Sequence, residues 1–234
     1  MKIESSLFLS FLRKVTLNSI IRTCVLDFRE DGLFIRVKDI SGGMVVRGLL
    51  PAKNFVEYQI QQIPVIDTEF LIKAIGGLKN TLNIKIENDM CVLSDENKKI
   101  NMAIGQADLL ENHLEKDINV SYDKFMALDS GILREICDNI KLFKDSEVRI
   151  EVKNNILFLK LGREGFNNIV YNIPVNFEDN VSKYGSLLKE IASVLTDKIE
   201  IAFKKDFPLF ITEKNNYEIL YIMAPLIDKQ IGES

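Results

Sequence analysis

The residues best suited to chemistry in this sequence are its single histidine and its three cysteines. His113 lies among Glu111, Asn112 and Leu114, and no Ser-His-Asp or Cys-His pair can be placed around it. A solvated surface histidine is therefore favoured over a catalytic one. The cysteines are far apart and form no Cys-x-x-Cys pair, so buried free thiols are expected rather than a zinc or redox centre. They are Cys24, Cys91 and Cys137.

Two further patterns match functional motifs only in part. Gly76-Gly77-Leu78-Lys79 lacks the Gly-x-x-x-x-Gly-Lys-Ser/Thr spacing of a phosphate loop, so a helix end is expected there. Several carboxylates fall near predicted turns without the rhythm of metal ligands, namely Asp27, Glu30, Asp31 and Asp39. The sequence therefore predicts no metal, no cofactor and no enzymatic activity, and a small-molecule enzyme is the least favoured class.

Length and composition indicate a folded, two-domain protein. The chain has 234 residues, of which 47% are hydrophobic and 27% charged, enough to bury a substantial core. The net charge of −4 gives no general attraction to nucleic acid, so any such binding depends on local arrangement. The apolar run Leu7–Leu12 is too short for a signal sequence or a membrane span, and we expect an intracellular protein without membrane association.

A unit of one helix followed by three strands recurs four times along the sequence. The predicted helices are Leu7–Ser19, Thr68–Lys79, Ser130–Phe143 and Tyr184–Leu195. A further strand is predicted before each helix, at Lys2–Ser5, Glu57–Val65, Ile118–Tyr122 and Val175–Asn180. The strands predicted after the helices are Cys24–Arg29, Gly32–Val37, Met44–Leu50, Leu82–Glu87, Met90–Ser94, Ile100–Ile104, Val148–Val152, Ile156–Leu161, Asn168–Ile173, Ile199–Phe203, Pro208–Glu213 and Tyr217–Met223.

This order predicts an α+β fold made of two similar domains, each with two β-α-β-β-β units. Alternating strands such as Val148–Val152 suit antiparallel sheets with one covered face, so the four helices are expected to line one side. The predicted domains are residues 1–104 and 118–234. Residues 105–117 are rich in Asp, Glu and Asn and are predicted to be an exposed connector.

The outward faces of the predicted helices are more basic than the rest of the chain. Projected at about 100° per residue, they carry seven basic and four acidic residues, a net charge of +3 in a chain of −4. The basic residues are Arg13, Lys14, Lys73, Lys79, Arg134, Lys141 and Lys189. Such a face suits sequence-independent contact with phosphates. Solvated helix faces with chance charges are the alternative, and the projection alone leaves it open.

The last unit resembles the carboxy-terminal region of proliferating cell nuclear antigen, the DNA sliding clamp. The similarity runs through Tyr184–Leu195 and Phe207-Pro208-Leu209 to the closing Ala224-Pro225-Leu226-Ile227. Earlier stretches resemble the same family, including Phe11-Leu12-Arg13-Lys14-Val15 and the segment from Ser130 to Cys137. The resemblance covers essentially the whole chain and is weakest in its centre.

The resemblance implies a closed ring, usually of three subunits, whose helices line a hole around duplex DNA and whose sheets lie outside. It implies that the seven basic residues above contact DNA, with Arg13 and Lys14 matching the family best. Glu135 and Asp138 depart from the family, which is often basic there; this puts the DNA contact of the third helix in doubt and would suit a ring with different partner subunits.

The resemblance also implies a subunit interface and a docking site for client proteins. Subunits would pair a strand of one domain with a strand of the other, here Ile100, Asn101, Met102, Ala103 and Ile104 with Asn168, Ile169, Val170, Tyr171, Asn172 and Ile173. Clients would insert a short apolar and aromatic motif against Leu109, Leu110, Pro208, Ile222, Ala224, Pro225 and Ile227. Connector packing and a covered last strand are the alternative interpretation of these apolar residues.

The function implied is that of a polymerase processivity factor that encircles DNA, docks replication and repair proteins, and is placed on DNA by a clamp loader. The competing hypothesis is a clamp-like scaffold, or one subunit of a heteromeric clamp that does not close around DNA by itself. A homotrimer is expected, with a heterotrimer as the alternative. The implied setting is the cytoplasm of an archaeon, or the nucleus or virus factory of a eukaryotic host.

Overall fold

The computed structural model describes residues 1–106, 120–143, 147–162, 167–196 and 198–227. Its contacts divide the chain into two compact units, Met1–Ile118 with Lys214–Leu220, and Asn119–Glu213 with Tyr221–Ser234. The second stretch of the first unit is therefore a hairpin turn that comes late in the sequence. The predicted connector, 105–117, lies outside the described residues from 107 onward.

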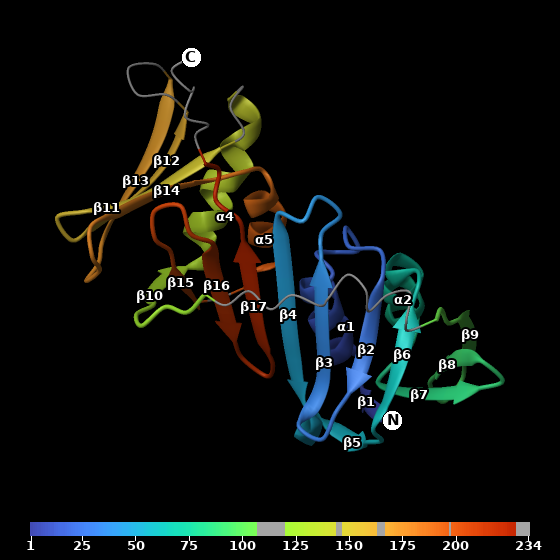
Figure 1. The fold of residues 1–234 in the computed structure, drawn as a ribbon. Helices are drawn as coiled ribbons and strands as arrows, with labels where there is room; N and C mark the ends of the chain where they lie inside the picture. Colours follow the sequence, from blue (N-terminus) through green and yellow to red (C-terminus); the bar gives the residue numbers. More distant parts are fainter. Residues whose placement is uncertain (107–119, 144–146, 163–166, 197, 228–234) are drawn as a thin grey trace, which may run out of the picture. The chain divides into compact units, whose positions relative to one another are not determined.

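The described residues of the first unit form two α-helices and two antiparallel groups of strands (Figure 1). The helices are α1 (Ser5–Val15) and α2 (Thr68–Gly76), and a short 3-10 helix spans Ala52–Asn54. One group has the order β5-β1-β7-β8-β9 and the other β4-β3-β2-β6. The strands are β1 Lys2–Glu4, β2 Cys24–Phe28, β3 Gly32–Lys38, β4 Met44–Pro51, β5 Phe55–Glu57, β6 Gln61–Val65, β7 Thr81–Glu87, β8 Met90–Ser94 and β9 Lys99–Ala103.

The second unit repeats this plan. Its helices are α4 (Ser130–Asp138), which continues as a 3-10 turn over Asn139–Leu142, and α5 (Leu187–Val194). The strand orders are β10-β15-β16-β17 and β13-β12-β11-β14. The strands are β10 Met126–Asp129, β11 Val148–Lys153, β12 Ile156–Gly162, β13 Asn168–Pro174, β14 Asn180–Tyr184, β15 Lys198–Ala202, β16 Leu209–Lys214 and β17 Glu218–Met223.

The repeats within each unit exchange their first strands. β1 precedes α1 but pairs with β7, and β6 precedes α2 but pairs with β2. In the second unit β10 pairs with β15, and β14 pairs with β11. Each sheet therefore needs both repeats of its unit, so the β-α-β-β-β repeat found in the sequence is not a separate folding unit.

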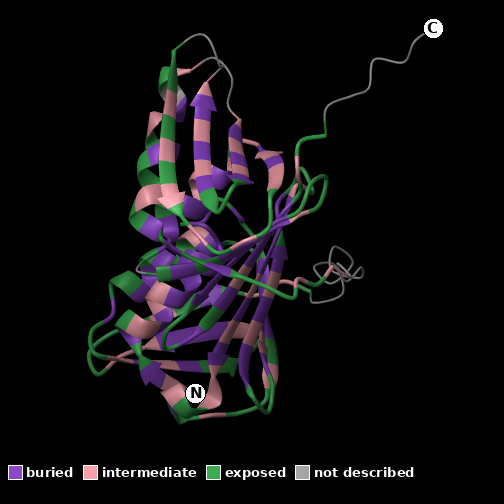
Figure 2. Ribbon diagram, turned by 90° about the vertical axis from the view of Figure 1, so that its left-hand side faces the viewer, coloured by how far each residue is buried: buried purple, intermediate pink, exposed green. Residues whose placement is uncertain are grey.

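Each helix buries one stripe against the strands, which appears in Figure 2 as alternating buried and exposed bands. In α1 the predicted stripe of Phe8, Phe11, Leu12 and Val15 is fully buried, which confirms the projection of that face. Gly48 in β4 permits this close approach, because a Cβ there would lie 2.5 Å from a methyl carbon of Val15. The antiparallel sheets with helices packed on them confirm the predicted fold class.

Aspartate side chains cap the starts of α2 and α4, whereas the predicted end of α1 is wrong. Asp67 accepts a hydrogen bond from the Phe70 amide at 2.9 Å, and Asp129 accepts one from Gly131 at 2.7 Å. The first helix ends at Val15 instead of Ser19, because the backbone from Leu17 to Ser19 has positive φ. Leu17 was predicted to point outward and is instead fully buried.

Three predicted strands before helices are misplaced. The run Glu57–Val65 divides, because β5 pairs with β1 while β6 pairs with β2 in the other group. The strand before α4 is Met126–Asp129; of the predicted Ile118–Tyr122, residues 118–119 lie outside the described residues and 120–122 form no strand. The strand before α5 is Asn180–Tyr184, not Val175–Asn180, because pairing with β11 holds Tyr184 buried in the sheet. In each case strand pairing outweighed local β propensity.

The second helix is turned slightly from its predicted orientation. Phe70 was predicted to be buried and is 42% exposed, whereas Ile72 was predicted to point outward and is 9% exposed. The helix ends at Gly76 instead of Lys79, with Gly77 as its C-cap. This confirms the expectation of a helix end at the glycine pair and leaves Lys79 in the following turn.

Candidate functional site

The helical surface of the first unit carries a shallow, mostly basic depression of about 460 Å³. Arg13 reaches it from α1, Arg22 from the segment that leads into β2, and Lys73 from α2. All three side chains are exposed, as predicted for Arg13 and Lys73. Glu69 is the acidic residue lining the depression, so its local charge is positive.

Glu69 holds two of these cations in place. Its carboxylate pairs with the Lys73 ammonium at 2.6 Å, one helical turn away, and with the guanidinium of Arg22. Hydrogen bonds from Lys73 and Arg22 lower the pKa of Glu69 to about 2, so the carboxylate is ionised at any physiological pH. The pairs are exposed and contribute little stability, but they orient both cations toward the depression.

Lys14 does not belong to this surface, and its predicted outward position is wrong. It is 4% exposed, and its ammonium lies 5.5 Å from the centroid of the Tyr217 ring, a cation–π distance. Tyr217 comes from the late hairpin turn that joins the first unit, and its hydroxyl lies 2.8 Å from the hydroxyl of Ser10. The projection missed this because no helix periodicity shows that a distant hairpin covers one side of α1.

Arg22 is the surface residue that the sequence reasoning missed. It follows the true end of α1 and therefore had no place in a projection of helical residues. Lys79 is exposed as predicted, but it lies beyond α2, where its backbone amide donates to Asp95 at 2.8 Å. The structure thus groups Arg13, Arg22 and Lys73 around one depression and places Lys79 in a separate turn.

The helical surface of the second unit is more acidic. Arg134 is exposed, and its guanidinium donates to the carbonyl of Leu195 at the C-terminal end of α5, where a cation is favourable. Glu135 and Asp138 are both exposed on α4. Lys189 is half-buried on α5, and the side chain of Lys141 lies outside the described part of the chain.

Glu135 has a structural partner that explains an acidic residue at this position. The Tyr171 hydroxyl of β13 hydrogen-bonds to the Glu135 carboxylate, which raises the pKa of Tyr171. The Glu135 side chain therefore links α4 to β13, a strand at the edge of its sheet. Asp138 precedes the 3-10 turn Asn139–Leu142 as its N-cap residue, but its side chain makes no cap hydrogen bond there.

The two strands predicted to form the subunit interface are both sheet edges. β9 ends the order β5-β1-β7-β8-β9, and β13 ends the order β13-β12-β11-β14. Every residue of β13 is at least partly exposed, including Ile169, Tyr171 and Ile173 on the side that faces α4. In the neighbouring β12, by contrast, alternate residues are fully buried. Among the described strands, β13 therefore presents a sheet edge with incompletely covered apolar side chains.

Residues 224–227, here called the closing segment, lie against β14 in the second unit. The Leu226 amide donates to the carbonyl of Lys183 at 2.8 Å, and its side chain lies beside Gly185. Leu226 and Ile227 are 44% and 66% exposed, and Pro225 is half-buried. Ala224 is exposed as well. An apolar surface is thus available at the predicted docking positions of this segment.

Two predicted docking residues have other surroundings. Ile222 is 2% exposed within β17. Its side chain therefore packs in the core, and the predicted direct contact with a client is corrected. Pro208 is half-buried, and its carbonyl accepts a hydrogen bond from the hydroxyl of Tyr122, whose ring packs edge-on to Phe210 at 4.9 Å. Burial raises the pKa of Tyr122 to about 12. Leu109 and Leu110 lie outside the described residues.

Comparison with solved structures gives high similarity over nearly the whole chain. The proliferating cell nuclear antigen from Entamoeba histolytica aligns with a TM-score of 0.79 and 17% identity, covering 97% of this chain and 98% of that chain. PCNA of A. fulgidus, bound to the C-terminal region of FEN-1, aligns with a TM-score of 0.81 and 15% identity over 98% of both chains.

The chain has the fold of a sliding clamp.

A third clamp structure, the PCNA2–PCNA3 complex from Sulfolobus tokodaii, aligns with a TM-score of 0.78 and 19% identity over 96% of this chain and 98% of that chain. By sequence, no protein-family model and no curated protein matches the chain. The clamp fold is therefore retained here with little sequence identity.

Residues that carry reactive chemistry in other proteins are buried or scattered in this clamp fold. The thiols of Cys24, Cys91 and Cys137 are buried, as predicted, and burial raises their pKa values to about 12. Within the described ranges, no three His, Cys, Asp or Glu side chains gather as a metal site. None of the helices described combines the length and apolar character needed to cross a bilayer.

Proposed function

We propose that this chain is a subunit of a DNA sliding clamp, a processivity factor that encircles duplex DNA and holds polymerases and other clients on it. The main support is the similarity of nearly the whole chain to solved clamps, with TM-scores of 0.78 to 0.81. It acts without catalysis, because a topological link needs only a closed ring and a surface that tolerates phosphates.

The depression around Arg13, Arg22 and Lys73 is the part of the helical surface best suited to DNA. Lys and Arg neutralise phosphates without reading sequence, so the duplex is free to slide. Because Glu69 already pairs with two of the cations, each phosphate competes with a carboxylate. We propose that this keeps the contacts weak and short-lived, as sliding requires. Lys79, Arg134, Lys141 and Lys189 stay in the proposal as additional contacts.

The edges β9 and β13 are the proposed subunit interface. Antiparallel pairing of β9 with β13 of a neighbour would join the two sheet edges by backbone hydrogen bonds. Ile100 and Met102 would meet Ile169, Tyr171 and Ile173 on one face of the joined sheet, because side chains alternate along each strand. A ring of three identical chains follows if each subunit contributes both edges.

Clients are proposed to dock on the apolar closing segment, with Leu226 and Ile227 as the most exposed side chains. The A. fulgidus clamp that this chain resembles holds the C-terminal region of FEN-1, which makes a short peptide motif the expected ligand class. Polymerases, repair proteins and a clamp loader are the proposed partners. The protein would work inside the cell, in an archaeon or in the nucleus or virus factory of a eukaryotic host.

A heteromeric ring is the second candidate. Asp138 is an exposed carboxylate on the helical surface, and one of the similar structures is a complex of two different clamp subunits. In such a ring, this chain would depend on partner subunits to close around DNA.

Retention on nicked circular DNA tests the main proposal. The protein, with a clamp loader if needed, should stay on the circle through gel filtration and be lost once the circle is linearised. Equal retention on circular and linear DNA would contradict encirclement and indicate ordinary electrostatic binding.

The solution mass separates the two kinds of ring. A homotrimer should have three times the 26.7 kDa of the chain, whereas a monomer would favour the heteromeric alternative. Ile169→Asp with Ile173→Asp should reduce a trimer to monomers, because two carboxylates would be buried at the joined edge. Val56→Asp, on an exposed position of β5, is the matched control and should leave the mass unchanged. A trimer that survives the double change would rule out the β13 edge.

A further inference from the structure

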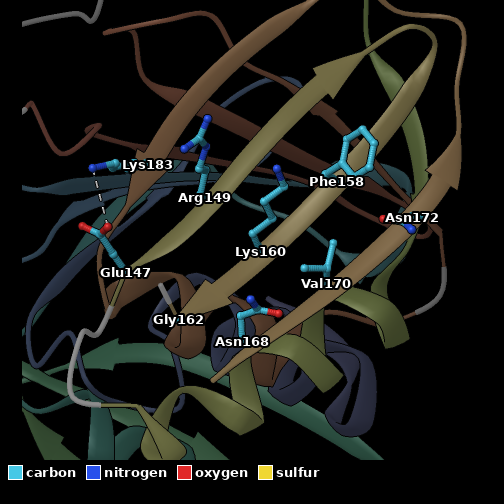
Figure 3. A pocket seen from close by; sticks show the side chains of 9 residues that line it. All are labelled: Glu147, Arg149, Phe158, Lys160, Gly162, Asn168, Val170, Asn172 and Lys183. Atoms are coloured by element: carbon cyan, nitrogen blue, oxygen red, sulfur yellow. Dashed lines mark ion pairs between the residues drawn. The ribbon is translucent and has the colours of Figure 1, made fainter. Parts of the chain in front are cut away.

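A concave surface of about 410 Å³ lies on the second unit, on the β13-β12-β11-β14 sheet (Figure 3). Along β11, Val148, Ile150 and Val152 point into the core, so Arg149 and Glu151 between them face the opposite side. Figure 3 shows side chains from all four strands on this face of the sheet, with that of Lys183 directed toward Glu147. The surface thus lies on the face of the sheet opposite the core, and the proposed DNA contacts of the helices are not part of it.

Three cations stand in one row across this sheet. Arg149 on β11 is directly opposite Lys160 on β12 and directly opposite Lys183 on β14. Neighbouring strands are about 4.8 Å apart, and like charges directly opposite each other destabilise a sheet. Stability alone would favour alternating signs at these positions. The row therefore points to an anionic ligand.

The carboxylates described at this surface are fewer than the cations of the row. Glu151 pairs with Lys160 at 2.8 Å and more loosely with Arg149 at 3.2 Å, while Glu147 lies 3.6 Å from Lys183. Among the described residues, two carboxylates thus pair with three cations. The Nε of Arg149 is buried and has no hydrogen-bond partner among the described residues. One N–H donor of the Arg149 guanidinium is therefore left unsatisfied within the described protein.

The cation row adjoins an apolar and amide surface. The Lys160 ammonium lies 5.0 Å from the centroid of the Phe158 ring. Val170, which is 43% exposed, is directly opposite Lys160 on β13, and Asn172 is directly opposite Phe158. A ligand that places an anion on the row would therefore also rest against a ring, an aliphatic side chain and a primary amide.

We propose that this surface binds a phosphorylated segment of a partner protein, with the phosphoryl group on the row of Arg149, Lys160 and Lys183 and the flanking residues against Phe158 and Val170. A phosphoryl group brings close to two negative charges and three acceptor oxygens to one point, which matches three cations on adjacent strands better than a carboxylate does. A continuous polyanion such as single-stranded DNA fits less well, because Glu147 and Glu151 flank the row.

The test is an NMR titration of the whole protein with a short peptide that carries one phosphoserine. Saturable shifts are expected for amides of β11, β12 and β14, with none from the unphosphorylated peptide and weaker ones from its Ser→Asp form. Arg149→Lys keeps the charge but loses the planar fork, so it should weaken binding at least about tenfold. Lys183→Gln should weaken it as well. Lys153→Gln, which removes an exposed cation from the same strand outside the surface, should leave binding unchanged.

Several results would overturn the proposal. They are the absence of saturable shifts, equal binding of the Ser→Asp peptide, or equal losses in Lys153→Gln and Arg149→Lys. Tighter binding of a single-stranded oligonucleotide of matched charge through the same amides would assign the surface to nucleic acid instead. The experiment uses neither DNA circles nor a loader, so its failure leaves the clamp proposal untouched, and the reverse also holds.

Discussion

The two units of the chain repeat one order of elements but expose different charges on their helices. In the first, Arg13, Arg22 and Lys73 surround a depression with Glu69 as its acidic member. In the second, α4 presents Glu135 and Asp138 beside Arg134. The buried stripes that build the fold are nevertheless equivalent. The fold therefore constrains the buried faces of the helices, whereas their exposed faces can differ between the units.

The comparison also separates cations that serve structure from cations available to a ligand. Lys14 in the first unit is buried against Tyr217, and Arg134 in the second donates to the end of α5. Arg13, by contrast, is exposed at the depression. Counting basic residues on a helix therefore overestimates the positive charge that its surface offers to a ligand.

The largest effect is expected at Lys14. Lys14→Glu places a carboxylate in a buried site against the face of an aromatic ring, and should lower the free energy of unfolding by about 3 kcal/mol. Urea denaturation measures this. Arg13→Glu, one residue earlier and exposed, is the control and should change stability little. Equal stability of the two variants would show that Lys14 is not buried in solution.

Reversing the exposed cations of the first unit should have the next largest effect. Arg13→Glu with Lys73→Glu should cut DNA retention about tenfold and reduce the slope of log affinity against log salt by about two, one for each phosphate contact. Gel-shift titrations at several salt concentrations measure both quantities. The fold should persist, because both residues are exposed. An unchanged salt slope would remove the depression from the DNA-facing surface.

Adding a cation to the second unit should make the charge of its helical surface more like that of the first unit. Asp138→Lys should strengthen DNA binding several-fold and steepen the salt slope by about one if a repelled phosphate becomes a contacted one. Glu135→Gln is the companion variant, because it removes a charge while its amide oxygen still accepts from Tyr171. No gain from Asp138→Lys would mean that α4 does not meet DNA.

The smallest effect is expected at Glu69. Glu69→Gln frees Lys73 and Arg22 from a competing carboxylate and should tighten DNA binding about twofold, the scale of an exposed ion pair. The folded-state pKa of about 2 lies below the ordinary value of 4.5, so the ion pairs are complete above about pH 4.5 and are lost only as pH falls toward 2. The difference between variant and parent should therefore be the same at pH 5 and pH 8. A difference that disappears at pH 5 would contradict the shifted pKa.

Much of the architecture was readable from local patterns. Strand β8 was predicted at its observed bounds, and the stripe of Phe8, Phe11, Leu12 and Val15 was placed correctly. The reason is that strand and helix periods report burial directly, provided the covering element is the expected sheet. Helix starts at Thr68 and Ser130 were also found, since each follows an aspartate that caps the first turn.

The errors arose where a distant segment decides the local structure. The partners of β5 and β6 lie in different strand groups, which a single run of β-forming residues cannot reveal. Arg22 joins the depression only because the chain turns back after Val15, and the predicted contact of Ile222 failed because β17 is covered. Surface membership depends on what covers a residue from elsewhere in the chain.

By itself, the sequence determined the fourfold order of helix and strands, the buried stripes and the acidic net charge, because each follows from residue type and spacing within a short window. Only the tertiary structure decided the exchange of first strands between repeats, the burial of Lys14 under Tyr217 and the row of Arg149, Lys160 and Lys183. These depend on strand register and on contacts between residues far apart in the chain, and local periodicity carries no information about either.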